Sequence, residues 1–419
     1  MSDLIAWGFL LYLASAFLST LFSMSWRTSL YGEHENFVGL ITVSAYVALF
    51  FGTRAFCKKP EECKTILIAA VLATAVLSLY GTVQSIGKDP FTWKRTADIG
   101  SSVTRIFGTM GHPNHLGAFL VMGLPILSFF RIEAWEKRFW PVFLILPVIE
   151  ALASALVVFS YSRGAWAAMI GMAILTVILL AMTTSKKGII LCVLFPWIVG
   201  AGFGATTFST VIMETSAPLP ASVSESSDSE LPVSAGPVDP DPIPPSTGAA
   251  PPLWERVKQM GPSALIHGTR WPIWTAAVNM FLDHPVLGVG LDCFRLAFEQ
   301  YRPKNYWLLE WGGTPTHAHN EFLHLLATQG GIGALAALIM TAGIGITFIR
   351  LIKRKEINRS FAIAVFSGIV VFYIQNLFSF TVIGTGTLFV TFAAILSRLG
   401  ESVPLRETRS NGPDAVPRL

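Results

Sequence analysis

The chain has 419 residues, of which 52% are hydrophobic and only 13% charged, and its mean hydropathy is +0.57. Soluble globular proteins carry about 25% charged residues, so this composition excludes an ordinary soluble domain and predicts a polytopic membrane protein. The net charge of +4 is modest and gives no reason to expect a nucleic-acid partner, and the four cysteines show neither a disulfide framework nor the spacing of a cysteine zinc site.

Ten apolar segments are long enough to cross a bilayer, which requires about 20 mostly apolar residues. They are residues 4–22, 37–56, 65–86, 114–130, 140–160, 164–184, 189–210, 325–350, 360–377 and 383–398. The first segment lacks a cationic start and a small-residue cleavage site, so we expect a retained helix and not a removed signal peptide. The sequence therefore predicts an all-α polytopic membrane protein with about ten transmembrane helices.

Basic residues orient these segments. Eighteen of the 30 Lys and Arg residues fall in alternate connections and the C-terminal tail, and Arg131 is counted among them. The positive-inside rule assigns this side to the cytoplasm. Both termini are then cytoplasmic, and three sizeable loops, 23–36, 87–113 and 211–324, lie outside. The assignment requires that the tight turn at 161–163 separates two spans.

The chain divides into five parts: the first seven spans (1–210), a Pro/Ser-rich outer segment (211–252), an outer helical loop (253–324), the last three spans (325–398) and a cytoplasmic tail (399–419). The Pro/Ser-rich segment has the composition of a disordered chain. In the outer helical loop, Trp271, Trp274, Val278 and Phe281 follow helical spacing. We expect this helix and a second amphipathic helix after it to lie on the outer membrane surface and cap a cavity.

Three arginines stand next to predicted helix ends on the outer side, namely Arg105, Arg163 and Arg270. Arginine is permanently charged, and its planar fork matches phosphate oxygens. If the three converge, they form a site for a diphosphate. The alternative for each is an interfacial arginine whose charged head reaches the membrane surface. Arg163 is the strongest candidate, because the neighbouring Ser162 and Gly164 allow close approach.

Three histidines, His317, His319 and His324, precede or open the eighth predicted span. A neutral imidazole at the position of His319 accepts a proton from a hydroxyl at neutral pH. The alternative is a helix-capping or interfacial histidine, and this is the preferred interpretation of His317 and His324. His317 and His319 also raise a zinc hypothesis, with His112 and His115 as further ligands. No HExxH helix or carboxylate set accompanies them, so no metal is expected.

Glu150 lies near the middle of the span at 140–160. An acid inside a membrane helix is a functional hypothesis by default. Glu150 either forms an ion pair, carries protons in a transporter, or packs in its protonated form. A transporter typically shows such groups in paired halves, and the other spans have essentially none. A transporter of a polyprenyl-linked or anionic solute remains the second class of function.

Four segments resemble the O-antigen ligase and Wzy-type polymerase superfamily, which includes bacterial O-oligosaccharyltransferases. His319 and Asn320 are followed, after nine residues, by Gly330 and Gly333. The other three segments are GTMGHPNHLGAFLVMGLP (108–125), SYSRGAWAAM (160–169) and RWPIWTAAVNMFLDHPVLGVGLDCFRLAF (270–298). The chain departs from the family's pattern at His112, in its ten spans against about twelve, and in the Pro-rich insert.

The resemblance implies a GT-C-like membrane glycosyltransferase in the bacterial inner membrane. Its donor is a glycan on undecaprenyl diphosphate, and its acceptor is a hydroxyl of a glycolipid or glycan at the outer, periplasmic face of the bilayer. His319 is then the general base of a displacement with inversion, Arg163 and Arg270 meet the diphosphate, and neither a cofactor nor a metal is required. The remaining substrate-binding residues implied by the resemblance are Arg105, Asn114, Asn320, Tyr161 and Trp274.

The resemblance leaves the acceptor open among three activities. The His-Asn and Gly-x-x-Gly spacing is closest to that of ligases, which favours an O-antigen ligase that uses lipid A-core as acceptor. A Wzy-type polymerase and an O-oligosaccharyltransferase remain as alternatives.

Overall fold

The computed structural model describes residues 3–34, 36–91, 106–183, 187–215, 270–304, 306, 314–354 and 358–401. Within these ranges the regular structure is entirely helical. Ten long helices dominate: α1 (Leu4–Leu21), α3 (Leu40–Phe56), α4 (Pro60–Ser85), α5 (Pro113–Glu136), α6 (Trp140–Phe159), α7 (Arg163–Thr183), α8 (Lys187–Thr215), α13 (Glu321–Lys353), α14 (Arg359–Asn376) and α15 (Ile383–Glu401).

The ten helices coincide with the ten predicted spans. Nine helices in the described part of the chain are long and apolar enough to cross a membrane, and α3 has 17 residues, just below the 18 of the shortest of the nine. A helix of about 17 residues still reaches across a typical hydrocarbon core. The chain is therefore an all-α polytopic membrane protein, as its composition predicts. The Pro/Ser-rich segment and the tail lie outside the described residues.

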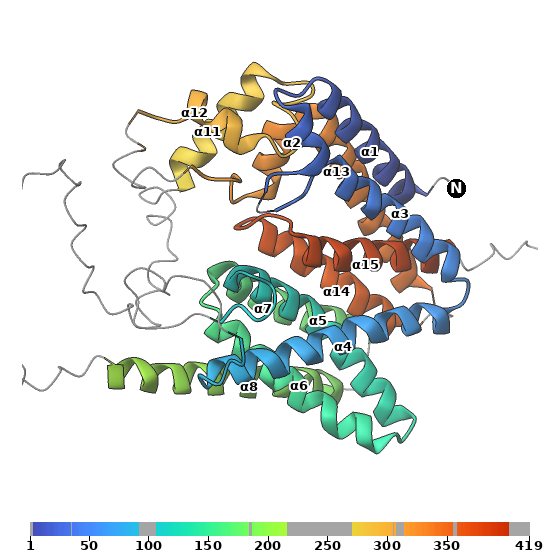
Figure 1. The fold of residues 1–419 in the computed structure, drawn as a ribbon. Coiled ribbons are helices and arrows are strands. Elements are labelled where there is room, and N and C mark those ends of the chain that lie inside the picture. Colours follow the sequence, from blue (N-terminus) through green and yellow to red (C-terminus); the bar gives the residue numbers. More distant parts are fainter. Residues whose placement is uncertain are drawn as a thin grey trace, which may run out of the picture.

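Three shorter helices complete the fold: α2 (Trp26–Tyr31), α11 (Arg270–Asp283) and α12 (Phe294–Tyr301). The helices α11 and α12 are the two that the sequence predicts in the outer loop. Both pack on α13, and Figure 1 shows them near α2 at one side of the bundle. Their apolar faces form a small core of their own around Phe294, Phe298 and Met280.

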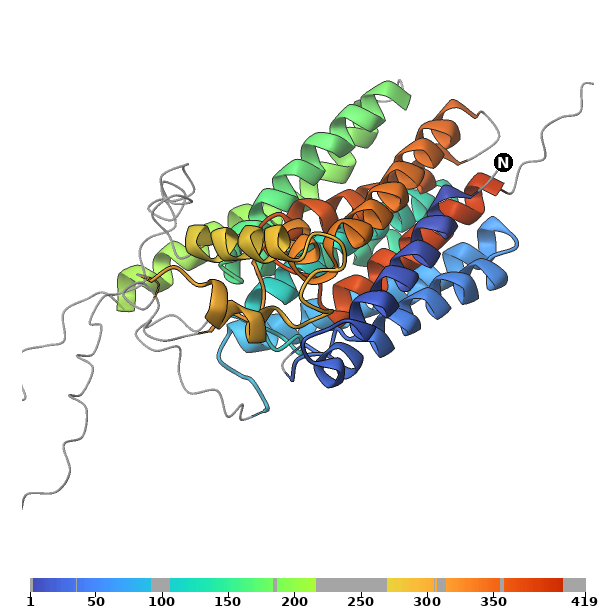
Figure 2. The same cartoon turned by 90° about the horizontal axis from the view of Figure 1, so that it is seen from above.

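Helix α5 is the most buried of the apolar helices. It packs against α4, α6, α7, α14 and α15. Glycines allow part of this close approach, because a Cβ added at Gly123 would lie 2.3 Å from Oγ1 of Thr74 on α4. Figure 2 shows that the long helices run side by side. Short connections between antiparallel neighbours bring the starts of α5, α7, α13 and α15 to one end, which we call the outer end.

Most of the predicted cytoplasmic charges gather at the opposite end. Arg54 forms ion pairs with Asp3 and Glu401. These pairs join the start of α1 to the ends of α3 and α15. Lys64 forms an ion pair with Glu133 at 2.5 Å. The arrangement agrees with one cationic face, although the direction in which that face points across a membrane stays a prediction.

The sequence prediction counts Arg131 among the cations of a cytoplasmic connection. The structure shows that this placement is wrong. Arg131 lies inside α5 with 2% of its surface exposed, and its Nε and Nη2 donate to the two carboxylate oxygens of Glu150 at 3.1 and 3.2 Å. The same guanidinium donates to the carbonyl oxygen of Cys192 on α8 at 2.8 Å. Because a buried charge requires a partner, Glu150 and Arg131 explain each other's position inside the bundle.

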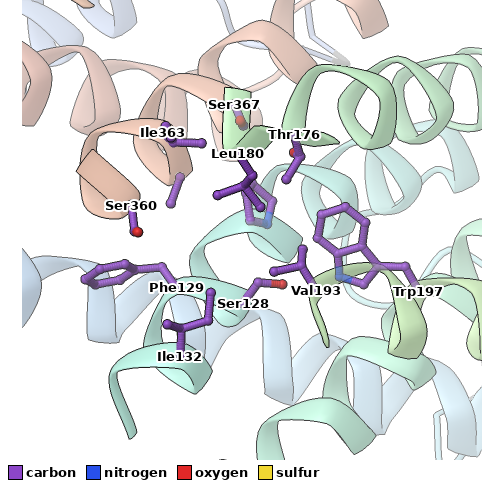
Figure 3. Close-up of a pocket in the computed structure, with 12 residues that line it drawn as sticks. Ser128, Phe129, Ile132, Thr176, Leu180, Val193, Trp197, Ser360, Ile363 and Ser367 are labelled. Carbon is purple, nitrogen blue, oxygen red and sulfur yellow. The ribbon is translucent and has the colours of Figure 1, made fainter. Parts of the chain in front are cut away.

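A cavity of about 30 Å³ lies beside this ion pair, between α5, α7, α8 and α14. Figure 3 shows the hydroxyls of Ser128, Thr176 and Ser367 and the indole of Trp197 around it. The residues belong to the halves of these helices that are remote from the outer end. The cavity is thus part of the packing around the ion pair and separate from the His-Asn segment at the start of α13.

Candidate active site

The start of α13 is bound to the loop between α14 and α15, residues 377–382. Asn320 caps α13, because its Oδ1 accepts the N–H of Leu323 at 3.0 Å. Its Nδ2 donates to the carbonyl oxygen of Leu377 at 3.2 Å. One residue further on, Oε2 of Glu321 accepts the backbone N–H of Thr381 at 2.8 Å. Asn320 therefore positions the segment that carries His319.

His319 has a left-handed backbone, with φ of 51°. This conformation is uncommon for residues other than glycine, and non-glycine residues in it are often found at functional sites. The indole N–H of Trp274 donates to the carbonyl oxygen of the preceding residue, Ala318, at 3.0 Å. Trp274, predicted to bind substrate, thus also holds the backbone that presents the His319 imidazole.

Phe380 of the α14–α15 loop brings the histidine-bearing segments together. Its ring centroid lies 5.4 Å from that of His115, 4.0 Å from that of His317 and 5.7 Å from that of His319. The start of α5, the segment before α13 and the α14–α15 loop therefore meet at one place on the outer end. Nothing in the sequence of this short apolar connection between α14 and α15 marks it as functional.

Arg270 opens α11 and lies beside His319. Its Nη2 donates to the carbonyl oxygen of Phe378 at 3.1 Å. Burial, together with the positive charge of Arg270, lowers the pKa of His319 to about 4. The imidazole is therefore neutral at pH 7, which is the form that accepts a proton.

Arg163 completes the predicted trio of catalytic residues. Burial and then the charge of Arg163 lower the pKa of Arg270, so the two guanidinium groups lie within electrostatic reach of each other. Arg163 is exposed at the start of α7, and no described residue accepts a hydrogen bond from it. The next residue, Gly164, packs so closely that an added Cβ would lie 3.0 Å from Oε1 of Gln375 on α14. Two like charges next to a neutral base make a site suited to an anion.

The remaining predicted residues occupy different positions. Tyr161 is 3% exposed, with φ of 55°, and its ring lies 6.0 Å from that of Trp166 inside the turn that presents Arg163. Asn114 is the second residue of α5, half-buried at the outer end, and its backbone N–H donates to Nδ1 of His112 at 3.1 Å. Arg105 lies outside the described residues.

An apolar cavity of about 120 Å³ adjoins the start of α13 and extends between α1, α3, α13, α14 and α15. Most of its lining is aliphatic or aromatic, with Tyr12, Tyr46 and Glu321 as its main polar members. It shares Glu321 and Thr381 with the segments that position His319. An apolar chain entering this cavity would therefore have its head close to the site.

The sequence favours capping or interfacial roles for His317 and His324, and the structure buries both beside Asp292. Among the described residues, these three form a group able to hold a metal ion. The zinc hypothesis drawn from the sequence groups a different set of residues, namely His317, His319, His112 and His115. Asp292 carried no signal in the sequence, because it lies 25 residues before His317 and follows an apolar turn.

Comparison with known protein families gives a match over the middle of the chain. Residues 148–338 match the family model described as O-antigen ligase, and this range contains Arg163, Arg270 and His319. No curated protein matches the chain. This match supports the resemblance to the O-antigen ligase and Wzy superfamily that the sequence indicates. The match and the nine bilayer-length apolar helices of the described residues are consistent with a multi-pass membrane protein similar to the O-antigen ligases.

Proposed function

We propose that this protein transfers a glycan from undecaprenyl diphosphate to an acceptor hydroxyl at the periplasmic face of the bacterial inner membrane. The observation that carries the proposal is the meeting of a neutral His319 with Arg270 and Arg163 at the outer end of an apolar bundle. The preferred activity is that of an O-antigen ligase, with lipid A-core as acceptor.

The two arginines are the diphosphate site of this proposal. The guanidinium N–H groups of Arg163 are available to donate to phosphate oxygens. Arg270 donates one hydrogen bond to the carbonyl oxygen of Phe378, and its other N–H groups remain for the diphosphate. Their mutual repulsion is relieved when an anion binds between them. The leaving diphosphate gains negative charge as the glycosidic bond breaks, and preorganised cations stabilise that charge in the transition state.

His319 is the general base. The acceptor oxygen attacks the anomeric carbon, His319 takes the hydroxyl proton, and the bond to the diphosphate oxygen breaks with its electron pair on the diphosphate. One displacement inverts the anomeric configuration. The bound diphosphate also offsets the charge of Arg270, so the pKa of His319 rises and the imidazole becomes a stronger base only when the donor is in place.

The apolar cavity of about 120 Å³ beside Glu321 supports a lipid substrate. A prenyl or acyl chain there would be surrounded by aliphatic and aromatic side chains, while its polar head would reach the outer end. A Wzy-type polymerase and an O-oligosaccharyltransferase would use the same donor site and differ in the acceptor. The transporter alternative has less support, because Glu150 is paired with Arg131.

The test is a reconstituted transfer assay with an undecaprenyl-diphosphate glycan and candidate acceptors. We expect transfer by the wild-type protein, also with a chelator added at the start of the assay. His319→Asn should lower the rate about 10²- to 10⁴-fold, the typical contribution of a general base. Asparagine is the informative substitution, since it tolerates the left-handed backbone at this position.

His284→Ala serves as the matched control, because His284 is an exposed histidine after α11. It should transfer at the wild-type rate. Wild-type activity in His319→Asn would refute the general-base role, and transfer to a growing glycan or to a protein instead of lipid A-core would identify one of the alternative activities.

A further inference from the structure

Behind the candidate active site, one carboxylate and two imidazoles meet in the protein interior. Asp292 comes from the segment between α11 and α12, His317 from the segment before α13, and His324 from the first turn of α13. Their exposed fractions are 2%, 2% and 8%. One potential ligand atom from each lies within 4.8 Å of those of the other two. This proximity brings together parts of the chain that are far apart in sequence.

Two buried polar atoms of this group have no hydrogen-bond partner among the described residues, namely Oδ1 of Asp292 and Nδ1 of His324. Nε2 of His317 lies 3.7 Å from Oδ1 of Asp292, which is too long for a hydrogen bond. Buried polar atoms without partners are rare in native proteins, and each requires an explanation. All three residues line a cavity of about 20 Å³, which is large enough for one water molecule or one ion.

Other polar atoms of Asp292 and His317 have partners that hold these two side chains in place. Oδ2 of Asp292 accepts the backbone N–H of Glu33 at 2.6 Å. Nδ1 of His317 lies 3.0 Å from the hydroxyl of Thr316 and 3.3 Å from the side-chain amide of Asn36. Metal-binding histidines and carboxylates characteristically have such contacts on their other polar atom, which orient the ligand toward the ion.

We propose that Asp292, His317 and His324 bind a divalent transition-metal ion, with Zn²⁺ as the best match. Two imidazoles and one carboxylate are an established ligand set for such ions, whereas Ca²⁺ and Mg²⁺ prefer oxygen ligands alone. Metal–ligand bonds of about 2.0 to 2.2 Å place tetrahedral ligand atoms roughly 3.3 Å apart. The three ligand atoms therefore need to move together by on the order of one ångström, which side-chain rotation provides. The cavity supplies the fourth position for a water molecule.

The ion has a structural role in this proposal and takes no part in glycan transfer. It joins the segment between α11 and α12 to the start of α13. The ring of His317 stacks on Phe380 at 4.0 Å and 13°, and Phe380 also contacts His319. Fixing His317 thus fixes the aromatic surface beside the base. The site is independent of the proposed function, because a structural ion can be present whatever the enzyme transfers.

The experiment measures metal content and stability of the full-length protein, purified in detergent with an affinity tag free of histidine. The protein is stripped with a chelator, returned to metal-free buffer and titrated with Zn²⁺. We expect one Zn²⁺ per chain by elemental analysis, a rise in the melting temperature on reloading, and visible d–d absorption when Co²⁺ is used instead. A chelator added only at the start of a transfer assay does not test this site, since a buried ion exchanges slowly.

The variants are Asp292→Asn and His324→Leu, with His284→Ala as the exposed-histidine control. Loss of an outer partner of a metal ligand lowers affinity about 10- to 100-fold, so loss of a direct ligand should weaken Zn²⁺ binding by at least about 100-fold. The control should bind as the wild type does. Asp292→Asn keeps the shape of the side chain, which guards against misfolding as the cause of lost binding, and the helical circular-dichroism signal checks each variant.

Two results would overturn the proposal. If the wild-type protein takes up no Zn²⁺ or Co²⁺, the cavity holds a water molecule that bridges Asp292 and His324. If both variants bind one Zn²⁺ with unchanged affinity, the ion lies elsewhere. Activity is not part of either criterion, so a failure of the proposed glycan transfer would leave this result intact.

Discussion

The His319 imidazole combines a left-handed backbone, burial and a neighbouring guanidinium. None of these three features is typical of a histidine on the protein surface. The backbone conformation presents the ring next to Phe380, and burial with the charge of Arg270 keeps it neutral. At the residue scale, the protein thus holds its candidate base in the unprotonated form over the whole physiological pH range.

The lowered pKa makes a prediction about pH. The pH profile of kcat/KM reports ionisation in the free enzyme, and the base must be unprotonated to act. With a His319 pKa of about 4, kcat/KM should stay level as the pH falls from neutrality to about 5, and should decline only near pH 4. An ordinary histidine with a pKa near 6.5 would already lose activity near pH 6.5, and an acid limb there would contradict this account. The measurement is the transfer rate at low substrate concentration across this range.

Arg163 gives a second prediction at this scale. Because it is exposed and no described residue accepts a hydrogen bond from it, Arg163→Gln should leave the melting temperature unchanged. Loss of a donor to the developing charge should lower kcat/KM by roughly 10²- to 10³-fold. Arg163→Lys should recover only part of the activity, since an ammonium lacks the planar fork.

The control for Arg163 is Arg302→Gln. Arg302 lies after α12 and forms a partly exposed ion pair with Glu299 at 3.2 Å. Such pairs contribute little to stability, so this variant should resemble the wild type in both measurements. Equal losses in Arg163→Gln and Arg302→Gln would point to a general electrostatic effect and not to a diphosphate site.

At the scale of elements, α5, α6 and α8 are joined by the ion pair between Arg131 and Glu150. Arg131 is buried where α5 packs against other helices, so its charge is shielded from water. The pair satisfies both charges where the helices cross. It therefore explains the acid inside the span at 140–160 by packing, without requiring that Glu150 carry protons.

Breaking this pair should destabilise the bundle. Arg131→Met leaves Glu150 buried and unpaired, and removing one partner of a buried pair typically costs about 3–5 kcal/mol. The double variant Arg131→Met, Glu150→Leu should regain most of that stability, because two apolar side chains replace two charges. Thermal unfolding in detergent measures both. A double variant as unstable as the single one would show that Glu150 has a role beyond the pair.

At the scale of the whole molecule, the alternation of helix direction decides which residues share a site. Arg163, Arg270 and His319 come from three parts of the chain, yet each stands at or next to a helix start that reaches the outer end. The opposite end holds the ion pairs of Arg54, Lys64 and their partners. The molecule thus separates its proposed chemistry from its predicted cytoplasmic charges.

The orientation is testable with single cysteines. His284→Cys should react with a membrane-impermeant maleimide in intact spheroplasts, since His284 is exposed near the outer end. Lys137→Cys, whose side chain is 67% exposed at the other end, should react only after the membrane is permeabilised. The unsubstituted protein measures labelling of the native cysteines. The reverse pattern would show that the proposed site faces the cytoplasm.

The class of fold, the ten long helices and the two helices of the outer loop are all predictable from the amino-acid sequence. Apolar segments of bilayer length leave the backbone few alternatives to a helix, because its polar groups must be satisfied within the segment. The resemblance in the His-Asn segment and the turn around Arg163 also indicated the superfamily that residues 148–338 match, and it included Arg270, which lies within electrostatic reach of both Arg163 and His319.

The contacts between side chains that are distant in sequence follow from the packing of the helices. The sequence placed Arg131 in a connection, and the packing of α5 buries it against Glu150. The sequence favours capping or interfacial roles for His317 and His324, and the fold buries them next to Asp292. Nothing in the sequence marks Phe380, whose ring lies next to those of His115, His317 and His319. Such contacts join residues separated by dozens or hundreds of positions, and local patterns of hydrophobicity contain no information about partners at that distance.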